Sequence, residues 1–207
     1  RRYAHSARHD VGVQTAESRR RRREVAADLA TAHGDVVHRA VLCRSGIGAS
    51  VVRAEIAAGR WTSMGRYTVA VATAPPGREA LLWRAVRESG AGAASDGVAS
   101  LVAFGLKGFD LDQIDVSVPA GTHPRVVSGV RTRRRRRPSP IVGVGLPRVR
   151  ADWATAHAAQ WARTDRAAAL LVCLPVQQRI VEPRRLLETW ESVRYSSRRT
   201  VHRAGRG

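Results

Sequence analysis

The sequence predicts an α+β fold, and two patterns of apolar residues lead to this prediction. Over much of the chain apolar residues recur at the spacing that buries one side of a helix. Two stretches, Arg60–Ala72 and Ile114–Val118, instead alternate apolar with polar residues, as a strand with one buried side does. Glycine and proline separate these stretches and mark the turns between them.

The charge balance indicates a partner with dense negative charge. The 207 residues include 36 basic and 17 acidic ones, which gives a net charge of +19, and every basic residue except Lys107 is arginine. A GC-rich genome explains arginine in place of lysine, but it does not explain the excess over acids. Because cations that neutralise phosphates release counterions, this charge favours a nucleic acid, and we expect double-stranded DNA.

Cysteine usage and hydropathy favour a cytoplasmic protein with its own core. Apolar residues make up 43% of the chain, and the mean hydropathy is −0.27. Cys43 and Cys173 each lie in an apolar run, so both are predicted to be buried thiols in a reducing compartment. The longest apolar run, Ala167–Val176, is about half the length needed to span a bilayer, so no membrane partner is expected. The chain begins at Arg1 without methionine, which leaves open whether it is a fragment of a longer protein.

The N-terminal segment combines an arm and a helix. Residues 1–17 have neither period and are predicted to form a flexible basic arm. Residues 18–34 have helical spacing, but arginines 19–23 lie at the start of that helix, where positive charge opposes the helix dipole. Either this run is a solvated tail or it binds phosphates. Its candidate DNA contacts are Arg19, Arg20 and Arg21.

Two short helices with a glycine turn between them predict a helix-turn-helix. The segment DVVHRAVLCRSG is predicted to be helical with Asp35 as its N-cap, and the helix Ala49–Ala58 follows the turn Gly46-Ile47-Gly48. Val52 and Ile56 lie one turn apart on the inner side of the second helix, which leaves short and basic side chains facing outward. Such a surface suits the major groove, where arginine binds guanine. The predicted DNA contacts of this pair are Arg44, Ser50 and Arg53.

The segment RWTSMGRYTVAVA is predicted to be a hairpin with one apolar and one basic side. Trp61, Ser63, Tyr67, Val69 and Val71 alternate onto the apolar side, across a turn at Met64-Gly65. A hairpin directly after the second helix of such a pair completes a winged helix. The alternative is an ordinary hairpin whose arginines are only solvated. The side chains assigned to the basic side are Arg60, Thr62, Arg66 and Thr68, of which Arg60, Thr62 and Arg66 are predicted DNA contacts.

Composition divides the chain into four parts. The basic arm 1–17 precedes a winged helix-turn-helix domain at 18–74, a small α/β module at 76–150 and a helical C-terminal segment with a basic tail at 151–207. The predicted fold is therefore α+β, with an N-terminal winged helix-turn-helix followed by a small α/β module and C-terminal helices.

The module and the C-terminal segment each have a predicted internal arrangement. In the module, Ser95 is the expected cap of a helix, and the strands 114–118 and 126–131 are expected to form a hairpin. Arginines 133–137 are expected in a solvated loop, with a phosphate contact as the alternative. The helices predicted for the last segment are Ala151–Trp161, Asp165–Gln178 and Pro183–Val193. Their expected core residues are Trp153, Trp161, Leu170, Leu171, Leu187 and Trp190.

No sequence pattern favours catalysis. Asp110, Asp112 and Asp115 form one acidic cluster whose plain role is to solubilise a loop and a strand, and the seven histidines are scattered without metal-ligand spacing. The stretches SGIGAS and GVGLPR lack the P-loop lysine and the complete dinucleotide fingerprint. We therefore predict no enzyme activity, no cofactor and no metal site.

Several segments together resemble one protein family. In chain order they are HGDVVHRAVLCRSGI, VVRAEIAAGRW, GRYTV, PPGREALLWRAV, IDVSVPAG and VQQRIVEPRRLLETWESVR. This order, between Val25 and Arg199, resembles the actinobacterial AbiEi-like antitoxins of type IV toxin-antitoxin systems. The most distinctive parts are Gly59–Trp61 and Val176–Arg179. Where relatives keep Gly-Val-Tyr after the wing turn, this chain has Gly65-Arg66-Tyr67.

The resemblance implies a transcriptional regulator that occupies its own promoter through the winged helix. It also implies a module that counters a nucleotidyltransferase toxin, and a homodimer would be usual, although no dimerisation helix is evident. Relatives commonly continue into a domain similar to very-short-patch-repair (Vsr-like) endonucleases, and this chain stops at Gly207 before such a domain. Two alternatives remain: the non-catalytic N-terminal part of such an endonuclease-like protein, and an antitoxin that binds protein without specific DNA binding.

Overall fold

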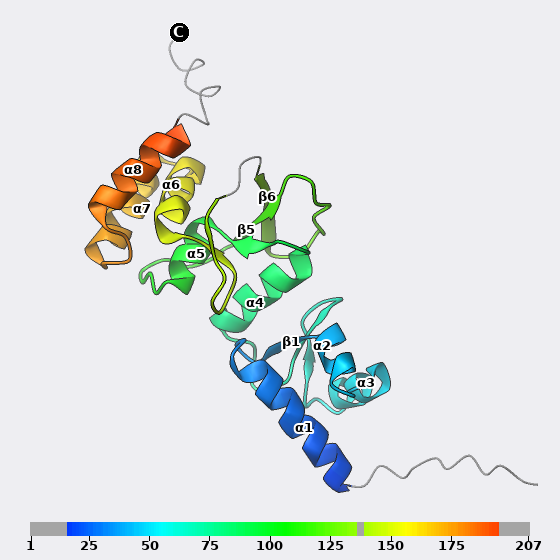
Figure 1. The fold of residues 1–207 in the computed structure, drawn as a ribbon. Coiled ribbons are helices and arrows are strands. Elements are labelled where there is room, and N and C mark those ends of the chain that lie inside the picture. The colour runs from blue at the N-terminus through cyan, green and yellow to red at the C-terminus, as the bar shows by residue number, and fades with distance from the viewer. Residues whose placement is uncertain (1–15, 136–138, 195–207) are drawn as a thin grey trace, which may run out of the picture.

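The described chain is a mixed α+β structure with eight helices and two sheets (Figure 1). The computed structural model describes residues 16–135 and 139–194, so the predictions for the basic tail and for most of the basic arm lie outside it. Within these residues no helix has the length and apolarity required to cross a bilayer.

Residues 16–71 form an N-terminal unit of three helices on a small antiparallel sheet, with strand order β1-β3-β2. Its core joins residues from every helix with Trp61 and Val69 of the hairpin, and Ile47 in the glycine turn is only 1% exposed. The elements are α1 (Ala16–Thr31), β1 (Val36–His38), α2 (Arg39–Arg44), α3 (Ala49–Ala57), β2 (Thr62–Ser63) and β3 (Thr68–Ala70).

The predicted start of α2 is wrong, because the first residues of the predicted helix form a strand. Asp35 is not an N-cap but a turn residue with φ of 63°, and the next three residues form β1 against β3. Val36 and Val37 are fully buried there, each in a different core cluster. This packing on both sides of the strand outweighs the helical spacing of the two valines in the sequence. The helix instead begins after His38, whose Nδ1 accepts a hydrogen bond from the Ala40 N–H at 3.1 Å.

The alternation predicted for the hairpin also fails in part. Trp61 and Val69 are buried as expected, but Ser63 is exposed and Thr68 is fully buried. The reason is that α4 (Arg78–Ser89) covers the side of β3 that was expected to face solvent. Both sides of β3 are therefore covered, and Thr68 is not part of a basic surface.

Residues 78–194 form a C-terminal unit around a five-stranded sheet of order β6-β5-β4-β8-β7. The predicted hairpin is wrong: β5 and β6 run parallel, and Ile114 pairs with Val130 at the start of the ladder. Arginines 133–135 belong to β6 rather than to a loop, and the other two arginines of that prediction, 136 and 137, lie outside the described residues. The elements are α4 (Arg78–Ser89), β4 (Ala94–Ser95), α5 (Gly97–Ala103), β5 (Ile114–Pro119), β6 (Val130–Arg135), β7 (Ile141–Val142) and β8 (Arg148–Val149).

Three helices complete the C-terminal unit: the first packs against α5, and the other two pack against the first (Figure 1). They are α6 (Ala151–Trp161), α7 (Asp165–Gln177) and α8 (Pro183–Arg194), within a residue of their predicted bounds. Leu171 is buried as expected, but Leu170 and Leu187 are 44% and 68% exposed. Cys43 and Cys173 are exposed, so the prediction of two buried thiols is wrong. Each cysteine lies on the outer side of a helix whose other side fills the core.

Candidate nucleic-acid interface

The exposed side of α3 has one long side chain among short ones. Val52 and Glu55 are buried, while Ser50 and Arg53 are exposed. The other exposed residues of this helix are Ala49, Ala54 and Ala57. Because these side chains are short, the helix backbone can approach a flat or grooved partner closely, and Arg53 is its only exposed cation.

The arginines of α2 lie at its two ends. Arg44 is in the last turn and is exposed. Arg39, which the sequence analysis did not select, is in the first turn and donates from Nη2 to the Ser63 Oγ at 2.9 Å. Its backbone N–H donates to the Tyr67 carbonyl at 2.7 Å. The start of α2 and the hairpin are therefore fixed to one another.

A buried carboxylate connects three parts of the N-terminal unit. Glu55 on α3 is 4% exposed, and its Oε2 lies 2.5 Å from the Nε of Arg60. Its Oε1 lies 3.7 Å from the Nε of Arg23 on α1. The hydrogen bond to Glu55 raises the pKa of Arg60. Arg60 is thus already paired, which weakens its predicted role as a phosphate contact, and spacing alone did not reveal this partner.

Cations surround one aromatic ring beside the hairpin turn. The Tyr67 ring lies 3.9 Å from the Arg125 guanidinium carbon and 5.4 Å from that of Arg66. The ring of His38 stacks on it at 5.8 Å. Burial, with help from the charge of Arg87, lowers the pKa of His38, so this imidazole is neutral at pH 7. Arg66 is exposed, and Thr62 on β2 is exposed as well.

Three arginines near the start of α1, Arg19, Arg20 and Arg21, are exposed, and Arg21 lies beside the glycine turn. Arg20 pairs with Glu24 at 2.8 Å within the helix, so its charge is partly compensated. Arg21 lines a shallow hollow whose opposite wall includes Ser45 and Ile47. Arg19 is exposed too. All the predicted contacts therefore lie in the N-terminal unit, but on several of its surfaces rather than on α3 alone.

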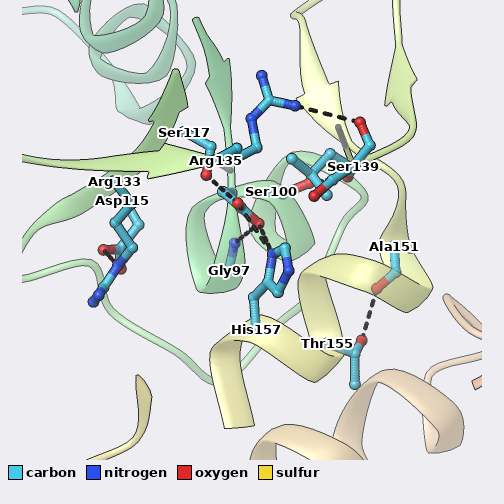
Figure 2. Close-up of polar contacts among 12 residues, drawn as sticks. Gly97, Ser100, Asp115, Ser117, Arg133, Arg135, Ser139, Ala151, Thr155 and His157 are labelled. Atoms are coloured by element: carbon cyan, nitrogen blue, oxygen red, sulfur yellow. Dashed lines mark hydrogen bonds and ion pairs between the residues drawn. The ribbon is translucent and has the colours of Figure 1, made fainter. Parts of the chain in front are cut away.

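A second polar cluster lies in the C-terminal unit and was not selected from the sequence (Figure 2). Asp96 is fully buried, and its carboxylate accepts hydrogen bonds from the Gly97 N–H at 2.7 Å and from the Ser117 hydroxyl. The Nδ1 of His157 on α6 lies 2.9 Å from it. Asp96, not Ser95, is the N-cap of α5. The cluster joins β4, β5 and α6 and is best explained as a structural helix cap. The Asp-Gly pair before the helix is the sequence pattern that could have predicted this cap.

Arg133 is part of the sheet packing rather than a free cation. Its Nε donates to the Asp115 carboxylate at 3.0 Å (Figure 2), and its guanidinium lies 3.8 Å from the centre of the Trp161 ring. Burial raises the pKa of Asp115 more than Arg133 lowers it. Asp110 and Asp112 are exposed and line the same hollow as Asp115, and Asp110 lies 3.4 Å from Arg78.

Comparison with known proteins adds no family assignment. No protein-family model matches the chain, and a search of curated proteins finds no match either. The residues and geometry described above are therefore the basis for the functional argument.

Proposed function

We propose that this chain is a DNA-binding transcriptional regulator of antitoxin type whose N-terminal unit is a winged helix. The order α1-β1-α2-α3-β2-β3, with a tight turn before α3 and a hairpin after it, supports this proposal. In that arrangement α3 is the recognition helix, and the hairpin β2–β3 is the wing.

The observation on which the proposal depends most is the exposed side of α3. A helix that enters the major groove needs short side chains for close approach and polar groups that reach base edges. Ser50 and Arg53 supply the polar groups, and alanines supply the close approach. Arg44, Arg66 and the arginines of α1 are the phosphate contacts of this arrangement.

The net charge supports the same proposal but does not by itself give specificity. A charge of +19 attracts any duplex, and binding of this kind weakens steeply with salt. Base contacts weaken less with salt, because they do not release counterions. Specific and non-specific binding can therefore be separated by ionic strength.

The test is binding to the gene's own upstream duplex and to a scrambled duplex, at low and moderate salt. The proposal expects a preference for the upstream duplex that survives moderate salt. In the Arg53→Ala/Arg66→Ala variant this preference should disappear. Equal, salt-sensitive binding to both duplexes would instead mean that the charge serves general adhesion to nucleic acid.

The resemblance to antitoxins extends the proposal to a protein partner. A nucleotidyltransferase toxin encoded by a neighbouring gene would bind the C-terminal unit. Coexpression of the two gene products and copurification through a tag on the toxin tests this part separately, since it does not depend on DNA binding.

A further inference from the structure

The turn of the hairpin is held by the C-terminal unit. The Tyr67 N–H and the Thr68 hydroxyl both donate to the Oε1 of Glu88, at 2.8 and 2.7 Å. Glu88 lies on α4 and is only 5% exposed. Because a buried N–H and a buried hydroxyl need acceptors, removing this carboxylate leaves both without a partner.

Two more contacts hold the same turn. The Nε of Arg84, one helical turn before Glu88, donates to the Met64 carbonyl at 2.6 Å, and its Nη1 donates to the Ser128 carbonyl at 3.0 Å. The side chain of Met64 packs against a core cluster that α4 and β5 share with Val36 and Ala70 of the N-terminal unit. At Gly65 an added Cβ would lie 2.5 Å from the Glu88 carboxyl carbon, so only glycine fits over this carboxylate without a shift.

We propose that Glu88 is a positioning residue for the wing, so that the C-terminal unit sets the affinity of the N-terminal unit for DNA. This inference rests on the proposed function. Glu88 fixes the turn between Gly65 and Thr68, and the turn fixes Arg66 and Tyr67 relative to α3. A wing that moves freely must be ordered when DNA binds, and that ordering opposes binding.

The sign of the charge effect makes the test sharp. Replacing any glutamate with a neutral residue makes the protein more cationic, which by itself strengthens binding to DNA. Loss of the wing contact acts in the opposite direction. The matched control is Glu79→Ala, because Glu79 is on the same helix, is exposed, and gives the same change in charge.

The experiment measures DNA affinity and the exchange rate of the Tyr67 amide hydrogen in the full chain, well below the melting temperature of each variant. In Glu88→Ala we expect affinity to fall about tenfold, as for a buried polar group left unpaired, and the Tyr67 amide to exchange faster. Glu88→Gln keeps an oxygen acceptor and should restore both. Glu79→Ala should bind as tightly as the parent or slightly more tightly.

Gly65→Ala provides a second variant with no change in charge. Its methyl group displaces the carboxylate, so it should weaken DNA binding in the parent but have little effect in the Glu88→Ala background, where the space is free. Unchanged Tyr67 exchange in Glu88→Ala, or affinity equal to that of Glu79→Ala, would overturn the inference. If the parent binds no duplex, the proposed function fails, while amide exchange still decides whether Glu88 holds the turn.

Discussion

The buried carboxylate of Glu55 lies 2.5 Å from the guanidinium of Arg60, so the base of the hairpin is tied to the third helix by an ion pair. A second arginine, Arg23 of α1, lies 3.7 Å from the other carboxylate oxygen. The helix proposed to contact DNA thus has a negative charge on its buried side. Its role is to hold arginines from two other elements against that helix.

Glu55→Gln should therefore weaken DNA binding although it makes the protein more cationic. The amide can still accept one hydrogen bond, but it does not compensate two guanidinium groups, so Arg23 and Arg60 become less ordered. We expect a lower melting temperature and affinity reduced several-fold. Fluorescence anisotropy and thermal unfolding measure both, and Glu24→Gln, at an exposed pair, is the matched control. Tighter binding by Glu55→Gln would show that the ion pair does not position these arginines.

Arg53 should determine most of the base preference. As the only exposed cation on α3, it is the one side chain there that can bind a guanine edge bidentately, an interaction that contributes about 1–3 kcal/mol of discrimination. Arg53→Ala should lose preference at one G·C pair, while its salt dependence changes little. Arg166→Ala, at an exposed position on α7, has the same charge change and should keep the preference. Selection of binding sites from random duplexes measures this outcome directly.

The neutral state of His38 predicts a dependence of stability on pH. Its folded pKa is below its ordinary value of 6.5, so the unfolded chain binds the proton first as pH falls. Stability is therefore complete above that value and decreases as pH falls through the folded pKa. His38→Asn should keep the helix cap, because asparagine is a good N-cap, while removing this decrease. Melting temperatures at about pH 7.5 and pH 5.5 for the two proteins test the difference.

Asp152 should contribute stability that is lost only in strong acid. Burial raises its pKa, but hydrogen bonds from Arg150 and Thr189 outweigh burial, and the net pKa is below the ordinary value of 3.8. The contribution is present above that value and is lost as pH falls through the lower folded pKa. Asp152→Asn should lower the free energy of unfolding at pH 7 by about 1–3 kcal/mol. Denaturant unfolding between about pH 3 and pH 7 should show the difference shrinking in acid.

Asp115→Asn is the control with the opposite sign. Because burial raises the pKa of Asp115, its charged form disfavours the folded state as pH rises above the ordinary value of 3.8. The variant should therefore gain stability relative to the parent over the same pH range. If both variants followed the same trend, the direction of at least one of the two pKa shifts would be wrong.

The helices of the last third were predictable because their signals are local. The helix Ala151–Trp161 has its predicted bounds, and Asp165 and Pro183 begin the next two as expected. An apolar stripe, a capping residue and a proline each act within a few residues. Local spacing also predicted correctly that Trp61 is buried and that Ser50 and Arg53 are exposed.

Contacts between distant residues decided what the sequence did not reveal. Val36 and Val37 are in a strand because β3 lies beside them, and Thr68 is buried because α4 covers it. The parallel pairing of β5 with β6 likewise depends on the path of the chain between them. The spacing of apolar residues cannot predict that Glu88 accepts a hydrogen bond from the Tyr67 N–H, twenty-one positions away.

By itself the sequence determined the α+β class, the helices of the last third and the excess of positive charge, because these depend on composition and on neighbours within a turn. Only the tertiary structure decided which charges are paired. Glu55 compensates Arg60, Asp115 compensates Arg133, and Arg53 remains exposed. The physical reason is that an ion pair depends on distance in space and on burial, and both are set by packing between elements that are far apart in the chain.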